Sequence, residues 1–97
     1  MAKKDEDRIL TLHPSGKKGT NILRSKYELI KDAIIKEIQK EQEITFEELS
    51  DRLVAEMQDN FDGRVIWYVV TVKLDLEARG IIERIPKTSP HQLRLID

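Results

Sequence analysis

The chain has 97 residues, a length typical of one domain with a single buried core. Hydrophobic residues make up 39% and charged residues 36%, so the chain is rich in charge but has too many Ile, Leu and Val for a disordered protein. The sequence has no cysteine, which excludes disulfides and thiolate chemistry, and no run of it approaches the roughly 18 apolar residues of a membrane span. The first residues also lack the apolar core of a signal peptide, so we expect a cytoplasmic protein with a disordered tail at 1–8 and a single domain at 9–97.

Charge is distributed unevenly along the chain. The net charge is −1, which by itself argues against a strongly electropositive nucleic-acid binder. Residues 38–62 carry 2 Lys/Arg against 8 Asp/Glu, whereas residues 1–37 carry 9 against 6 and residues 63–97 carry 6 against 4. The middle of the chain is therefore acidic and both flanks are mildly basic.

The first ordered segment is short. Residues 9–12, Ile-Leu-Thr-Leu, fit either a short strand or a packed arm, and residues 13–21 read as a loop because of their Pro, Gly and small polar residues.

Two capping boxes mark the starts of the first two helices. Ser25-Lys26-Tyr27-Glu28 precedes apolar residues at helical spacing, and Thr45-Phe46-Glu47-Glu48 precedes a second such set. The two buried stripes are predicted to be Tyr27, Ile30, Ile34 and Ile38 in the first helix, and Phe46, Leu49, Leu53 and Met57 in the second. Between the boxes, Ile44 suits a single short strand. The outer face of the second helix is acidic, with Glu47, Glu48, Asp51 and Glu56.

The stretch from Arg64 to Arg79 carries conflicting signals. Residues 71–77 alternate polar and apolar residues, which is typical of a strand. Its length, a cap at Asn60 or Asp62, and Gly80 just after Arg79 favour a helix, which is our prediction.

The chain closes on two predicted strands, residues 81–85 and 92–96, joined by a flexible tip at 86–91. Three helices, a lone strand residue between the first two, and a terminal hairpin form the element order of a winged helix, an α+β fold. The segment Leu76-Glu77-Ala78-Arg79-Gly80-Ile81-Ile82-Glu83-Arg84 resembles the junction between recognition helix and wing in many winged-helix domains. Together with His13-Pro14-Ser15-Gly16-Lys17 and Trp67-Tyr68, it is also similar to a family of small bacterial proteins of unassigned function, over residues 13–96. The resemblance implies the fold and says little about function, because this fold serves DNA binding, RNA binding and protein assembly.

Motifs for chemistry are weak. His13 and His91 each lie in a Pro-containing loop without the further ligands of a zinc site. Gly16-Lys17-Lys18 departs from a phosphate-binding loop, since Lys18 stands where Ser or Thr is required and Thr11 where the leading Gly would be. No catalytic set of residues stands out, so we expect a non-enzymatic binding module that needs no cofactor.

The leading functional expectation is double-stranded DNA. On a helical wheel Arg64, Tyr68, Thr71, Asp75 and Arg79 form one polar stripe, expected to face outward into a major groove. Arg84, Lys87 and Arg94 of the hairpin, and Lys17 and Lys18 of the early loop, would contact phosphates. The acidic second helix would repel the duplex, and pairs such as Asp75–Arg79 also occur on ordinary exposed helices. The alternative is a protein-interaction or dimerisation module without nucleic-acid binding.

A second apolar flank on the third helix needs a cover. The core would bury one apolar stripe of this helix, formed by Val65, Val69, Val72 and Leu76. A second set of apolar residues lies on a different side of the same helix: Ile66, Trp67, Val70 and Leu74. The cover is either the early segment, whose Ile9, Leu10, Leu12, Ile22 and Leu23 otherwise lack partners, or a second copy of the chain. We favour the early segment, which could also add a strand to the terminal hairpin, and we expect Trp67 to be a packing residue.

Overall fold

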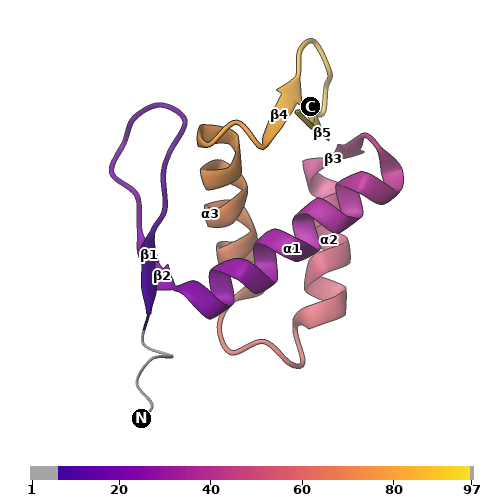
Figure 1. Cartoon of the computed structure of the whole chain (residues 1–97). Helices are drawn as coiled ribbons and strands as arrows, with labels where there is room; N and C mark the ends of the chain where they lie inside the picture. Colours follow the sequence, from indigo (N-terminus) through magenta and orange to yellow (C-terminus); the bar gives the residue numbers. More distant parts are fainter. Residues whose placement is uncertain (1–6, 97) are drawn as a thin grey trace.

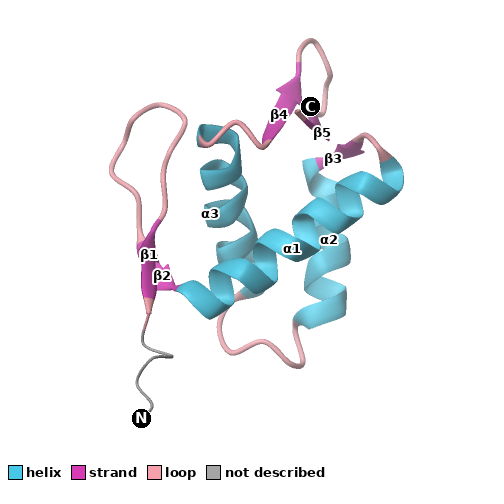
Figure 2. Cartoon of the chain, in the orientation of Figure 1, coloured by secondary structure: helices cyan, strands magenta, loops and turns pink. Residues whose placement is uncertain are grey.

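The computed structural model describes residues 7–96, a small α+β domain of three helices and two antiparallel sheets (Figures 1 and 2). Its elements are β1 (Arg8–Leu10), β2 (Asn21–Leu23), α1 (Arg24–Glu41), β3 (Ile44–Thr45), α2 (Phe46–Met57), α3 (Val65–Ala78), β4 (Ile82–Ile85) and β5 (Gln92–Leu95). Most of the expected tail at 1–8 lies outside the described residues, but Arg8 is already part of β1. None of the helices among the described residues is both long enough and apolar enough to cross a membrane.

Helix α1 begins before the predicted capping box. Its first residue is Arg24 and its N-cap is Leu23, with no side-chain cap, so the prediction that Ser25 caps the helix is wrong. The physical reason is that β2 runs directly into the helix, and Asp7 supplies a partner for the helix start. The backbone N–H of Arg24 donates to the carbonyl of Asp7 at 2.9 Å, and Nε of Arg24 donates to its carboxylate at 3.0 Å.

Helix α2 begins where its capping box predicts. Oγ1 of Thr45 accepts a hydrogen bond from the backbone N–H of Glu48 at 3.1 Å, which satisfies one of the otherwise unpaired amides of the first turn. The same Thr45 ends β3, whose Ile44 pairs with Leu93 of β5, so the short strand expected at Ile44 is confirmed.

Helix α3 is a helix in spite of the strand-like alternation at 71–77, as predicted. It ends in a Schellman motif, because Gly80 N–H donates to the carbonyl of Glu77 at 3.1 Å and Ile81 N–H to that of Leu76 at 2.9 Å. Gly80 has φ +76°, a conformation that glycine adopts without a Cβ penalty. The predicted cap at Asn60 or Asp62 is wrong: the N-cap is Arg64, without a side-chain hydrogen bond.

The two sheets lie on either side of α3 in Figure 1. Strands β4 and β5 form the predicted terminal hairpin, and β3 extends it to the order β3-β5-β4. Strand β1 pairs with β2, with Ile9 opposite Ile22, so the early strand makes its own hairpin and does not join the terminal one. Strand β2 was not expected from the sequence. We call residues 8–23 the N-terminal hairpin and residues 82–95 the terminal hairpin.

One core joins the helices and the terminal sheet. The stripes predicted for α1 and α3 are buried, whereas in α2 Leu49 and Leu53 are buried and Phe46 and Met57 only partly so. The remaining buried apolar residues come from the strands: Ile22, Ile44, Ile82 and Leu93. This core fixes which side of α3 faces inward and leaves the opposite side as a surface.

Candidate functional site

Helix α3 presents an apolar surface to solvent. Ile66 and Trp67 are each 43% exposed and Val70 is 37% exposed, and half-buried Leu74 continues the same side of the helix. We call Ile66, Trp67, Val70 and Leu74 the α3 face. The prediction that the N-terminal hairpin covers this flank is therefore wrong for its first three residues. The hairpin loop reaches α3 only near Thr71 and Leu74, where these residues and hairpin residues line a small pocket.

Part of the polar stripe predicted to face outward instead faces the protein, while its Arg64 and Arg79 remain exposed. Asp75 is completely buried and accepts hydrogen bonds from the Tyr27 hydroxyl at 2.5 Å, from the Leu12 backbone N–H at 2.8 Å and from Nε of Arg79 at 2.9 Å. We call these four residues the Asp75 cluster. Burial, and after it the hydrogen bond to Asp75, raises the pKa of Tyr27, and the hydrogen bond to Asp75 raises the pKa of Arg79. The cluster joins the N-terminal hairpin, α1 and α3.

Two other members of that stripe, Tyr68 and Thr71, are also engaged within the chain. Tyr68 is half-buried, and its ring meets Phe61 edge-on at a centroid distance of 5.0 Å and Trp67 at 4.9 Å. The ammonium of Lys26 lies 5.3 Å from the Tyr68 ring centroid. Thr71 is half-buried beside the N-terminal hairpin. Arg64 is exposed at the first end of α3.

The hairpin cations do not form one surface with α3. Arg94 donates from Nε to Oε2 of Glu83 at 2.7 Å, across the β4–β5 pair. Arg84 lies opposite Leu93 in the β4–β5 register, one position away from the Glu83–Arg94 pair. Because successive side chains of a strand point to opposite faces of the sheet, Arg84 and Arg94 lie on opposite faces. Lys87 is exposed at the tip of the terminal hairpin. Helix α3 has 14 residues and is about 21 Å long, which separates Arg64 from these three residues.

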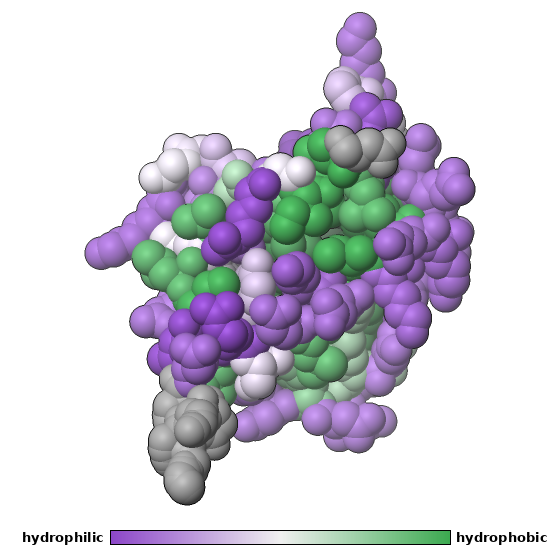
Figure 3. Space-filling model, viewed as in Figure 1, coloured by the Kyte–Doolittle hydropathy of each residue, from purple (hydrophilic) through white to green (hydrophobic). Residues whose placement is uncertain are grey.

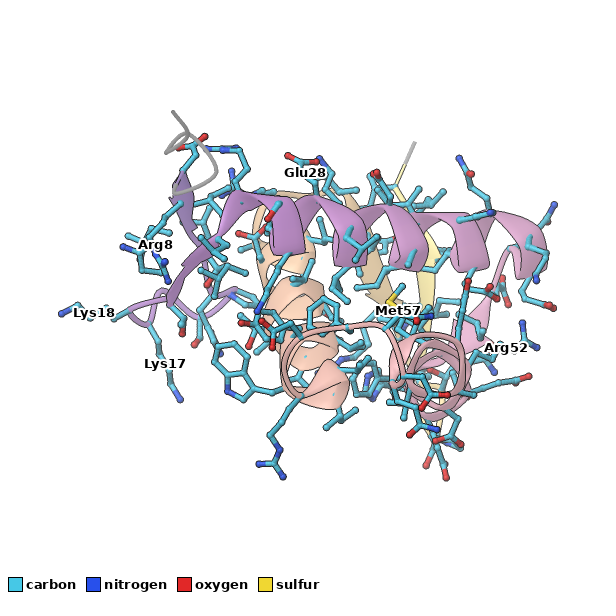
Figure 4. The ribbon with its side chains drawn as sticks, turned by 90° about the horizontal axis from the view of Figure 1, so that it is seen from below. Arg8, Lys17, Lys18, Glu28, Arg52 and Met57 are labelled. Atoms are coloured by element: carbon cyan, nitrogen blue, oxygen red, sulfur yellow. The ribbon has the colours of Figure 1, made fainter. Side chains whose placement is uncertain are left out.

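A separate group of cations lies on the N-terminal hairpin. Lys17 and Lys18 are exposed in its loop, and Figure 4 shows them on the same side of the molecule as Arg8, with Arg52 on the opposite side. Arg52 donates to three carboxylates, those of Glu37 at 3.1 Å, Glu41 at 2.9 Å and Glu48 at 2.5 Å. On the face seen in Figure 3, hydrophilic residues surround apolar patches, one over the N-terminal hairpin and one between α1 and the terminal hairpin.

A cleft of about 410 Å³ opens at the far end of the α3 face. It is lined by residues 13–15 of the N-terminal hairpin, by Leu74 and Glu77 of α3, by residues 82–84 of β4 and by Ile96. The sequence did not indicate this cleft, because residues 13–15 are more than 50 residues away along the chain from the rest of its lining. Leu74 belongs both to the cleft and to the α3 face, so the two are continuous.

Behind this cleft lies a buried ion pair. Nζ of Lys73 is 3.2 Å from Oε2 of Glu77 and 5.2 Å from the ring centroid of Phe46, and the Lys73 side chain is 6% exposed. The His91 ring stacks on Phe46 at 6.0 Å. Burial lowers the pKa of His91, and Lys73 and Arg84 lower it further. Nε2 of His91 is buried without a hydrogen-bond partner among the described residues, whereas the buried Oε2 of Glu77 has Lys73 as its ion-pair partner.

Metal chemistry finds no support in this arrangement. Within residues 7–96, no three or more His, Cys, Asp or Glu side chains gather as a metal ion would require. His13 accepts at Nδ1 from the backbone N–H of Ser15 at 3.1 Å, a local loop contact.

Comparison with known proteins places the chain in a family. The model of one protein family, described as a family of unknown function (DUF6958), matches residues 8–93, and no curated protein and no solved structure matches the chain. The matched range contains all three helices, strands β1 to β4 and the first half of β5. Since the match covers most of the chain, this protein belongs to the family DUF6958.

Proposed function

We propose that this chain is a non-enzymatic winged-helix module that binds a protein through the α3 face. The fold part of the proposal is supported by the element order α1-β3-α2-α3-β4-β5 and by the sheet order β3-β5-β4, in which the terminal hairpin is the wing. In this arrangement α3 holds the position of the recognition helix. What the module binds then depends on the side chains that α3 presents.

The observation that carries the proposal is the apolar character of the α3 face. Its residues Ile66 and Trp67 are adjacent and Val70 lies about one turn further on, and all three expose large apolar side chains to water. A contiguous apolar surface containing Trp is typical of a protein-binding surface, where Trp is among the residues that contribute most binding energy. The one basic residue between Val65 and Ala78 is Lys73, which is buried and paired with Glu77.

DNA binding, the leading expectation from sequence, has less support from this geometry. Direct readout needs Arg, Lys, Asn or Gln on the outward side of the helix, and α3 presents none there. Arg79 and Arg94 are held in ion pairs, and Arg84 and Arg94 leave opposite sides of the hairpin. Lys17 and Lys18, with Arg8, remain as a group that could contact a phosphate backbone. DNA binding therefore stays a prediction, which a binding assay with duplex DNA tests.

A photo-crosslinking experiment tests the proposal. A benzophenone amino acid replaces Ile66 on the α3 face or, as a matched exposed control, Asp51 on α2, in cells that carry the native gene. We expect discrete protein adducts from position 66 that disappear when Trp67→Asp is added, and none of these adducts from position 51. Identical adduct patterns at the two positions would refute the proposal.

Fluorescence anisotropy with a mixed-sequence duplex tests the DNA prediction on the same protein. If DNA is the ligand, binding at low salt weakens as salt rises, and Lys17→Ala with Lys18→Ala reduces the salt dependence. If the α3 face is instead the functional surface, no such binding is expected, and Trp67→Asp leaves the anisotropy unchanged.

A further inference from the structure

We propose that the partner of the α3 face is a second copy of this chain, in a two-fold dimer whose α3 helices run antiparallel. Trp67 of each copy enters the cleft at the far end of the other copy's α3 face. This inference rests on the proposed function, because it names the protein that the α3 face binds.

The α3 face carries both a projecting side chain and a cleft. Trp67 is 43% exposed near the start of the helix, and the cleft of about 410 Å³ begins at Leu74, seven residues further on. Seven residues of helix span about 10 Å, so the projection and the cleft are displaced along the same side of one rigid element. A surface with both features can be complementary to itself.

The antiparallel orientation follows from this displacement. A two-fold axis crossing α3 near Val70 places Val70 opposite its own copy and Ile66 of one copy opposite Leu74 of the other. Trp67 then faces position 73 of the other copy, next to Leu74 at the mouth of its cleft. A parallel pairing would instead place Trp67 against Trp67 and leave both clefts without an occupant. The antiparallel contact is isologous, so it closes at two copies.

The charge at the start of the face agrees with this orientation. Arg64 is exposed at the first end of α3. A parallel dimer would bring the Arg64 side chains of the two copies together, where like charges repel, whereas the antiparallel dimer places them at opposite ends of the contact. At the cleft end, Glu77 is 11% exposed and already neutralised by Lys73 at 3.2 Å, so it adds no unpaired charge to the contact.

Because the sequence has no cysteine, an introduced cysteine can form a disulfide only with the same cysteine of another copy. Val70→Cys lies on the proposed axis, and Asp51→Cys on exposed α2 is the matched control. Under mild oxidation we expect Val70→Cys to form a covalent dimer rapidly at low protein concentration and Asp51→Cys to remain monomeric. Adding Trp67→Ala should slow the cross-link about ten-fold or more, as expected for loss of a central Trp anchor.

Sedimentation equilibrium on the full cysteine-free chain measures the association directly. We expect the average mass to rise toward twice the chain mass as concentration increases from about 1 µM to about 500 µM. Trp67→Ala should shift that rise to higher concentration, whereas Leu10→Ala, an exposed apolar change on β1, should leave it in place. Circular dichroism confirms that each variant is folded before its mass is compared.

The outcomes separate this inference from the proposed function. A chain that stays monomeric throughout, while position 66 cross-links to a protein of another mass in cells, overturns the dimer and leaves the proposed function standing. A monomer without any specific adduct overturns both. A dimer that is insensitive to Trp67→Ala, or in which Asp51→Cys cross-links as fast as Val70→Cys, uses another surface and overturns this inference.

Discussion

Replacing Asp75 by Asn tests the claim that a buried carboxylate holds the N-terminal hairpin to the helices. Asp75 accepts hydrogen bonds from Leu12, Tyr27 and Arg79, and it is fully buried. Asparagine keeps the shape of the side chain but removes its charge. It also turns one acceptor into an NH₂ donor that faces groups which themselves donate.

The magnitude follows from the partners that are left behind. Removing one member of a buried ion pair costs about 3–5 kcal/mol. The Arg79 side chain is 34% exposed, so water can solvate part of the freed guanidinium, and we expect the lower end, about 3 kcal/mol. A chain of this length has a free energy of unfolding of about 5–15 kcal/mol, so the change removes a large share of it. Tyr27→Phe deletes a single hydrogen bond to a charged group and should cost about 1.5–3 kcal/mol.

Urea denaturation gives the free energy of unfolding of each variant, and hydrogen exchange reports the Leu12 amide separately. In Asp75→Asn the Leu12 amide should exchange faster than the amides of α1 at urea concentrations where the helices remain folded. Asp51→Asn, on the exposed face of α2, is the matched control and should change stability by less than about 0.5 kcal/mol. An Asp75→Asn variant within about 1 kcal/mol of the parent, with Leu12 still protected, would refute the reasoning.

Three further predictions concern stability. Thr45→Ala should lower the free energy of unfolding by about 1 kcal/mol because it removes the α2 cap, while Ser25→Ala, inside α1, should leave the urea midpoint nearly unchanged. Gly19→Ala should cost about 1–3 kcal/mol, since its Cβ would lie 1.6 Å from the carbonyl oxygen of Thr11; unaltered thermal unfolding would contradict that contact. The pKa of His91 is lower in the folded than in the unfolded chain, mainly through burial. As the pH falls, His91 therefore binds a proton in the unfolded chain before it does so in the folded chain. The free energy of unfolding should be at its full value above about pH 6.5 and decrease below it. His91→Gln should remove this part of the pH dependence.

Sequence patterns predicted the elements whose signals are local. The Thr45 box, the Gly80 terminus and the strand at Ile44 are each decided by neighbouring residues, and the structure confirms all three. The box at Ser25 has the same local pattern but fails, because Asp7, 17 residues earlier, satisfies the backbone amide of Arg24. A cap supplied from outside the helix leaves no mark in the helix sequence.

The candidate site was harder to predict because a helical wheel assigns polar residues to water. Asp75 is buried because three donors converge on it, one of them 63 residues away. Lys73 is buried because Glu77 and the Phe46 ring receive its ammonium. The wheel assigned the stripe of Val65, Val69, Val72 and Leu76 to the core correctly. It was wrong on the two flanks, because Asp75 is buried whereas Ile66, Trp67 and Val70 are exposed.

The bond between Leu12 and Asp75 also affects the order in which the chain can fold during synthesis. The N-terminal hairpin leaves the ribosome first, whereas Asp75, its main anchor in α3, is made 63 residues later. At about 5–20 residues per second this delay lasts roughly 3–13 s. During that time the Leu12 amide lacks its carboxylate partner, and the hairpin loop has no α3 surface to contact near Thr71 and Leu74. The loop of the hairpin is therefore fixed against the rest of the domain only when α3 has emerged.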